Sequence, residues 1–209
     1  MRFPPRALLQ PDPGGHVVRL NGVENERPGR IILLNGASSS GKSSIGRELQ
    51  RSLADPWFFF PVDALGAMRS TEHTRCLEAA EIDAMLHRTR RGYHRAVAAL
   101  AEAGNDVIMD YPLTEPWRLA DLLDVLAPYD VTLVDVRCAA EELDRRERAR
   151  ADRPAGLARS QVLIFDHDDR DIAVDTTRTS PTVCARAIAE LMGSLSAPKA
   201  FERLRTRQP

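Results

Sequence analysis

The chain has 209 residues, which is enough for one α/β domain with a substantial core but short for two independent domains. Its 29 basic and 30 acidic side chains nearly cancel, so the positive field of a dedicated nucleic-acid-binding protein is absent and no nucleic-acid partner is expected. The three cysteines are widely spaced and form no C-x-x-C pair, which disfavours a disulfide framework and a zinc site and favours a reducing cytoplasm. No apolar run approaches the roughly 18 residues of a membrane span, so we expect no membrane partner. The composition leaves the oligomeric state open, a homo-oligomer included.

The two ends of the chain differ in composition from its middle. Residues 1–29 contain prolines and glycines that interrupt regular elements, and we expect them to form a flexible arm. A single domain should follow over residues 30–196. The basic, proline-bounded residues 197–209 are expected to be a frayed tail.

Five short apolar segments predict strands, and helical patterns lie between them. The strand segments are "IILLN" (31–35), "FFFPVD" (58–63), "DVIMD" (106–110), "VTLVDVRC" (131–138) and "DIAVDTT" (171–177). The helical segments are residues 42–53, 82–103, 117–126, 139–150 and 182–195. This alternation predicts an α/β three-layer sandwich with a five-stranded parallel sheet and helices on both faces. Ligands of such sheets bind beyond the carboxyl ends of the strands.

"GASSSGKS", residues 36–43, fits the phosphate-binding pattern G-x-x-x-x-G-K-[ST] and stands between a predicted strand and a predicted helix. Glycines let successive backbone N–H groups turn toward a phosphate, and the helix adds the partial positive charge of its N-terminus. Lys42 would then reach the β- and γ-phosphates of ATP, and Ser43 would ligate Mg²⁺. The alternative is a serine-rich surface turn. The expected nucleotide-binding residues are Gly36, Ala37, Ser38, Ser39, Ser40, Gly41, Lys42, Ser43 and Ser44.

Two aspartates close predicted strands. Asp63 ends the second, where a carboxylate can orient an acceptor hydroxyl and take its proton; alternatively, it caps a helix beginning at Ala64. Asp110 ends the third strand behind an apolar run. If the third strand neighbours the first, Asp110 falls beside Ser43 and can hold Mg²⁺. A simple turn residue at the strand end is the alternative for Asp110.

Three aromatic residues are further candidates for contact with the acceptor. Tyr111 follows the third strand and, with the next proline, should bend the chain over the acceptor pocket. Tyr93 and His94, in "RRGYHRA", are candidates for the same side. Because the histidines show no metal-ligand spacing, a structural or surface role competes with the functional interpretation of His94.

An arginine-dense segment, about residues 144–161, is expected to form a lid over the nucleotide. In a helix Arg146, Arg150 and Arg153 would share one face and could neutralise the triphosphate. Arg146 stands four residues after Glu142, so an ordinary surface ion pair is the competing interpretation. Arg150 and Arg153 have no acidic residue at that spacing and are the better candidates. The following "RPAG" is a break that would let the lid move.

Taken together, these elements resemble chloramphenicol 3-O-phosphotransferase and its relatives among the small P-loop kinases. The shared stretches are "IILLNGASSSGKSSI", "DPWFFFPVDAL", "AALAEAGNDVIMD", "RRERARADRPAG" and "VDTT" at residues 174–177, in the family's order. The resemblance implies ATP as donor, a small-molecule hydroxyl as acceptor, Asp63 as the catalytic aspartate and adenine near Thr177. It also implies lid roles for Arg146, Arg150 and Arg153, with Arg150 contacting the nucleotide. The chain departs from the family at Tyr111, where relatives often carry an acidic residue, and in its shorter segment over residues 65–90.

We therefore expect an ATP-dependent kinase that phosphorylates a hydroxyl of an antibiotic, chloramphenicol-like or another natural product, as a resistance mechanism. One alternative is a metabolic kinase acting on a nucleoside, a sugar or a shikimate-like acid. Another is a nucleotide-binding regulatory module without catalysis. A polynucleotide kinase is disfavoured by the near-neutral charge and the few aromatic residues.

Overall fold

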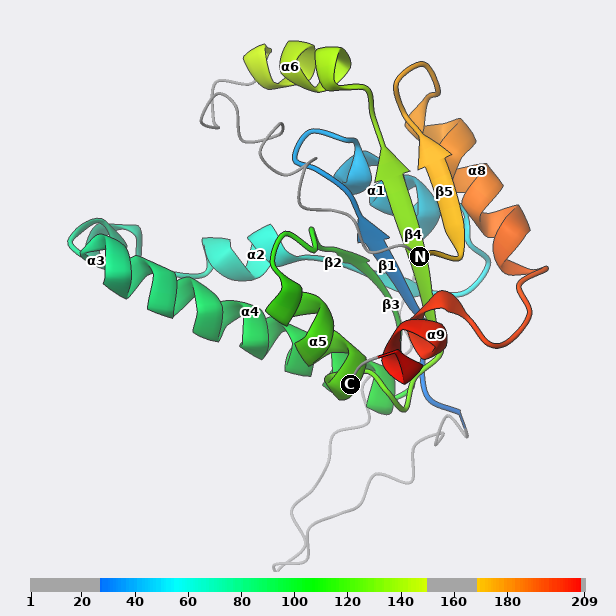
Figure 1. Cartoon of the computed structure of the whole chain (residues 1–209), viewed down its shortest axis with the longest axis horizontal. Helices are drawn as coiled ribbons and strands as arrows, with labels where there is room; N and C mark the ends of the chain where they lie inside the picture. The colour runs from blue at the N-terminus through cyan, green and yellow to red at the C-terminus, as the bar shows by residue number, and fades with distance from the viewer. Residues whose placement is uncertain (1–26, 150–168, 208–209) are drawn as a thin grey trace, which may run out of the picture.

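All five predicted strands pair in one parallel sheet, in the order β2-β3-β1-β4-β5 (Figure 1). The computed structural model describes residues 27–149 and 169–207, so the expected arm lies almost entirely outside the described residues. The strands are β1 (Ile31–Asn35), β2 (Trp57–Pro61), β3 (Asp106–Asp110), β4 (Val131–Arg137) and β5 (Ile172–Asp175). The predicted α/β class and its parallel sheet are confirmed.

Helices cover both faces of the sheet because each central strand is apolar on both sides. The helices are α1 (Lys42–Ser52), α2 (Val62–Ala67), α3 (Thr71–Arg75), α4 (Ala79–Glu102), α5 (Pro116–Val125), α6 (Ala140–Arg148), α8 (Pro181–Met192) and α9 (Ala200–Thr206). In β1, Ile31 and Leu33 join the core under α4, α5 and α9, whereas Ile32 and Leu34 join the core under α1 and α8 (Figure 1). Among the described residues, no helix combines the length and apolar character that a membrane crossing requires.

The strand order decides which side chains meet at the functional edge. β3 lies between β2 and β1, with Asp110 in register with Pro61 on one side and Leu34 on the other. The backbone N–H of Tyr111 donates to the carbonyl of Leu34 at 3.1 Å, which holds the end of β3 against the end of β1. The last residue of β3 therefore lies between the segment after β2 and the loop after β1.

The expected frayed tail is instead an ordered helix, α9. Phe201 is 4% exposed and packs with α5 and β4 in the core. The backbone N–H of Ala200 donates to Asp171 at 2.6 Å, and Lys199 donates to Asp130 at 2.5 Å. The basic residues of this segment lie on the outer face of a short helix. They dominate the sequence pattern, so the pattern predicts a frayed tail and not a packed helix.

Residues 62–75 also differ from expectation, since they form the short helices α2 and α3. The sequence pattern predicts a strand up to residue 63, with a helix from Ala64 only as an alternative, and no element over residues 71–75. Ser70 is the N-cap of α3 and accepts a hydrogen bond from the backbone N–H of His73. Both helices are too short for their apolar residues to show a clear period.

The close approach of α1 to β2 depends on a glycine. A Cβ at Gly46 would lie 2.2 Å from the ring of Phe59, whereas a Cβ at Gly92, in α4, would have no atom within 4 Å. We expect Gly46→Ala to lower the free energy of unfolding by about 1–3 kcal/mol, because the ring or the helix must move. Gly92→Ala should raise it by about 0.5–1 kcal/mol, since it removes unfolded-state entropy at a helical position without a clash. Urea unfolding of both variants measures the difference, and equal effects of the two substitutions would contradict this packing.

Candidate active site

The loop between β1 and α1 has the backbone geometry of a phosphate-binding nest. Gly36 and Gly41 have φ angles of +153° and +99°, and Ser39 has a φ of +62°. A Cβ at Gly36 would lie 2.4 Å from the carbonyl oxygen of Val136, so the first glycine is required both for conformation and for space. Ser39 is held in a conformation that non-glycine residues rarely adopt, and such strain is typical of functional loops.

Lys42 lies across this loop. Its side chain is almost completely buried, and Nζ donates to the carbonyl oxygens of Gly36 and Ala37, both at 2.8 Å. The hydroxyl oxygens of Ser39 and Ser40 are buried and have no hydrogen-bond partner among the described residues. Buried hydroxyls without partners are rare, and phosphate oxygens would satisfy them. The loop therefore fits the phosphate tail of a nucleotide.

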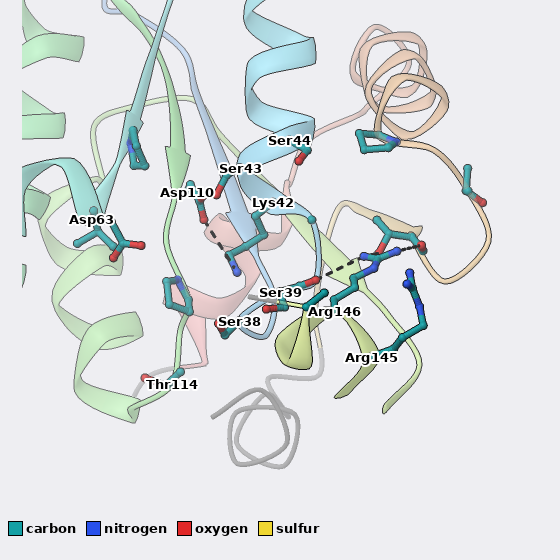
Figure 2. A pocket seen from close by; sticks show the side chains of 18 of the residues that line it. Ser38, Ser39, Lys42, Ser43, Ser44, Asp63, Asp110, Thr114, Arg145 and Arg146 are labelled. Carbon is teal, nitrogen blue, oxygen red and sulfur yellow. Dashed lines mark hydrogen bonds and ion pairs between the residues drawn. The ribbon is translucent and has the colours of Figure 1, made fainter. Parts of the chain in front are cut away.

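Ser43 and Asp110 meet at the end of the neighbouring strand. The Ser43 hydroxyl donates to Oδ2 of Asp110 at 2.5 Å, and Nζ of Lys42 lies 3.9 Å from Oδ1 (Figure 2). The expected adjacency of the first and third strands is confirmed. A hydroxyl and a carboxylate are hard oxygen ligands of the kind that Mg²⁺ prefers. Among the described residues, no group of three or more His, Cys, Asp or Glu side chains could hold a metal ion, so Mg²⁺ here would also need phosphate oxygens.

Asp63 does not end the second strand, as the sequence predicts, but lies two residues beyond it. β2 ends at Pro61, which is the N-cap of α2, and Asp63 occupies the first turn of that helix. It therefore does not cap a helix beginning at Ala64. Its exposed carboxylate stands near a helix N-terminus, where negative charge is favourable, and it lines the same cavity as Lys42 and Asp110.

This cavity has a volume of about 570 Å³ and extends to both sides of the phosphate-binding loop. Figure 2 shows Asp63 and Asp110 on one side of the loop and Arg145 and Arg146 on the other. We call the side with Asp63 the acceptor side and the side with Arg146 the nucleoside side, after the roles predicted from the sequence. The loop between them is where a phosphoryl group would pass.

Arg146 forms the expected surface pair and also lines the cavity. Its Nε donates to Glu142 at 2.7 Å, which is the expected i,i+4 pair. Its guanidinium also donates to the carbonyl of Thr176 at 2.6 Å and to that of Ser39 at 3.4 Å. Arg146 thus joins α6, the phosphate-binding loop and the segment after β5 into one wall of the cavity. Arg150 and Arg153, and most of the expected lid, lie outside the described residues.

On the same side of the cavity, Thr176 and Thr177 have different surroundings. The hydroxyl of Thr177 accepts a hydrogen bond from the backbone of Ala139 at 2.8 Å, and Thr177 does not line the cavity. Thr176 does line it, and its hydroxyl donates to the carbonyl of Ser40 at 2.7 Å. The sequence "VDTT" does not distinguish the two threonines, because the end of β5 determines which one faces the cavity. Contact of Thr177 with the nucleotide stays a prediction. Arg145, which also lines the cavity, gave no signal in the sequence.

The structure places Tyr93, His94 and Tyr111 beneath the acceptor side rather than in it. All three side chains are fully buried, and none lines the cavity. Tyr93 donates to the carbonyl of Phe60 at 2.5 Å, and His94 Nδ1 lies 2.5 Å from Asp121. Burial raises the pKa of both tyrosines and lowers the pKa of His94, which favours the uncharged forms. Their role is to pack α4 against β3 and α5, and Tyr111 stacks on Tyr93 with ring centroids 5.3 Å apart.

The fold and this cavity together define a P-loop kinase that acts on small molecules. Residues 29–193 match the family described as chloramphenicol phosphotransferase-like protein. The chain belongs to that family.

Two Mycobacterium tuberculosis sequences, from strains CDC 1551 and H37Rv, are similar to this chain. Each is 32% identical over 211 residues, covers 90% of this chain and 93% of its own length, and carries the provisional name O-phosphotransferase. A sugar kinase from Janibacter has the same fold, with a TM-score of 0.59 at 22% identity over 79% of this chain and 95% of its own. A tunicamycin resistance protein from Deinococcus radiodurans also has it, with a TM-score of 0.59 at 19% identity over 78% of this chain and 96% of its own.

Proposed function

We propose that the protein transfers the γ-phosphoryl group of ATP to a hydroxyl group of a small molecule in the cytoplasm. One observation carries the proposal: Lys42, Asp63 and Asp110 line a single cavity around a loop with the geometry of a phosphate nest. The cytoplasmic location agrees with three free cysteines, Cys76, Cys138 and Cys184.

In this proposal the chain binds and orients both reactants. The loop amides and Lys42 hold the β- and γ-phosphates, and Arg146 and Thr176 form the wall on the nucleoside side. Ser43 and Asp110 would hold Mg²⁺, which supplies charge neutralisation at the phosphates when it is bound.

Asp63 orients the acceptor hydroxyl and accepts its proton. The bond from the γ-phosphorus to the oxygen shared with the β-phosphate breaks, and a bond from that phosphorus to the acceptor oxygen forms. ADP and the phosphorylated acceptor leave. Because the transition state is loose, holding the hydroxyl in line matters as much as removing the proton.

An antibiotic or similar natural product is the first acceptor class to test. The support is the family itself, together with the tunicamycin resistance protein that shares the fold. A metabolic acceptor is the second candidate, favoured by arginine side chains in the acceptor side of the cavity. A regulatory module without catalysis has less support, because Lys42, Ser43, Asp63 and Asp110 all line one cavity.

The test is a screen of antibiotic and metabolite alcohols with purified full-length protein, ATP and Mg²⁺. We expect release of ADP that depends on the acceptor, together with a gain of one phosphoryl group in the acceptor's mass. Chelation of Mg²⁺ with EDTA should abolish both signals, and excess Mg²⁺ should restore them. Tight ATP binding without transfer to any compound of a broad panel would count against catalysis.

A further inference from the structure

The acceptor side of the cavity contains two arginines with no role in the steps described above. Arg90 of α4 and Arg118 of α5 line the cavity together with Asp63 and Asp110. The two helices pack against each other, which brings the arginines to the same wall. Because both side chains are positively charged and lie next to the reacting centre, they favour some acceptors over others by the charge of the acceptor.

Arg118 is a fixed charge in this wall. Its side chain is 5% exposed, and it donates to the carbonyl of Pro112 at 2.9 Å and to the carboxylate of Glu115. Its Nε is buried without a partner among the described residues. These bonds hold the turn between β3 and α5, so Arg118 has little freedom to move toward a ligand.

Arg90 is the guanidinium that remains available. Within the part of the chain that the structure describes, it makes no hydrogen bond, and its one ion pair is to Glu115 at 3.8 Å. Glu115 is already bonded to Arg118, so a single carboxylate serves both arginines. Burial is the main cause that lowers the pKa of Arg90, and repulsion from Arg118 and Arg69 adds to it. A half-buried cation with so weak a partner gains by binding an anion.

We propose that the acceptor carries an anionic oxygen group, a carboxylate or a phosphate, which Arg90 binds while the acceptor hydroxyl lies at Asp63. This inference rests on the proposed phosphotransfer and names the class of its substrate. A neutral acceptor would leave Arg90 without a strong partner in the complex, and such mismatches discriminate strongly between substrates. The atoms exchanged in the transfer are unchanged, because the anionic group takes no part in the chemistry.

The experiment compares related acceptors of which one member carries an anionic group and the other is neutral. We would test gluconate and glucose 6-phosphate against glucose, glycerate against glycerol, and shikimate against its methyl ester, then extend the acid-and-ester pairing to hits from the screen. We expect kcat/KM to favour the anionic member of a productive pair by about 10- to 100-fold, as for a hydrogen bond to a charged group. The carboxylate and phosphate arms show which oxyanion the site prefers.

Variants of Arg90 connect that preference to one side chain. Arg90→Gln should raise KM for the anionic acceptor by about 10- to 100-fold, a much larger effect than on the neutral member or on KM for ATP. Arg90→Lys should recover part of the loss because it keeps the charge. The matched control is Arg88→Gln, two residues earlier on the exposed face of α4, which should change none of these values.

The result that overturns the inference is distinct from the failure of phosphotransfer. Equal turnover of acids and neutral partners, or equal losses for both in Arg90→Gln, would refute the anionic acceptor and leave the kinase activity standing. If no acceptor is phosphorylated, calorimetric titration of the same pairs in the presence of a non-hydrolysable ATP analogue decides the point. Binding of the acids that depends on Arg90 would support the inference, and no preference for the acids across the pairs would refute it.

Discussion

Replacing Lys42 by alanine is expected to lower kcat/KM for acceptor phosphorylation by about 1,000-fold, the effect of removing a preorganised charge from a site that stabilises a transition state. The lysine is almost completely buried in the loop, 3.9 Å from Asp110, so water can replace its charge only poorly. Steady-state rates from coupled ADP release, measured at saturating acceptor, give the comparison. Both kcat and KM for ATP should change, since Lys42 would contact the phosphates before and during transfer.

The matched control for Lys42→Ala is Arg51→Ala. Arg51 is an exposed cation on the same helix, and its ion pair is with Glu48. Its loss should leave the kinetics unchanged. A rate for Lys42→Ala within a few-fold of the unmodified protein would show that the loop does not carry the phosphates during transfer.

Asp63→Asn is expected to lower kcat by about 100- to 10,000-fold, the range over which a positioned general base acts. The affinity for ATP should be unchanged, because Asp63 stands across the cavity from the nucleoside side (Figure 2). A fluorescent ATP analogue measures the affinity, and single-turnover transfer with saturating acceptor measures the chemical step. Thermal unfolding of the variant checks that the start of α2 is intact.

Asp83→Asn serves as the control, since it removes an exposed carboxylate on α4 that lies outside the cavity. Full activity in Asp63→Asn would remove Asp63 from the mechanism. A rise in KM for the acceptor at constant kcat would instead assign it a role in binding the hydroxyl alone.

The phosphate-binding loop could be predicted because its geometry is encoded locally. Two glycines at fixed spacing, followed by Lys42, specify both the left-handed turns and the charge within eight consecutive residues. Asp110 was predictable in the same way, because an apolar run with a terminal aspartate describes a buried strand end. The burial observed for Lys42 and Asp110 agrees with that interpretation.

The acceptor side could not be predicted, because it depends on which faces of α4 and α5 meet. Tyr93 and His94 lie on the same helix as Arg90, three and four residues later, yet the two aromatic residues are buried and the arginine lines the cavity. A buried aromatic residue in the core and an aromatic residue that lines a pocket occupy the same kind of position in a helical sequence pattern. Only the packing of the helices distinguishes them. Arg90 and Arg118 come to the same wall of the cavity only because the two helices pack against each other. The sequence pattern of either helix alone does not show this.

The position of α9 shows that the family match and the folded unit have different ends. The match stops at residue 193, yet Ala200 and Phe201 fill the core beside α5 and β4. A recombinant fragment cut at the end of the match would leave that apolar surface exposed to solvent, with the aggregation hazard that such patches bring. A fragment chosen for expression should therefore extend past α9. Comparisons of stability between members of the family should use fragments that contain this helix.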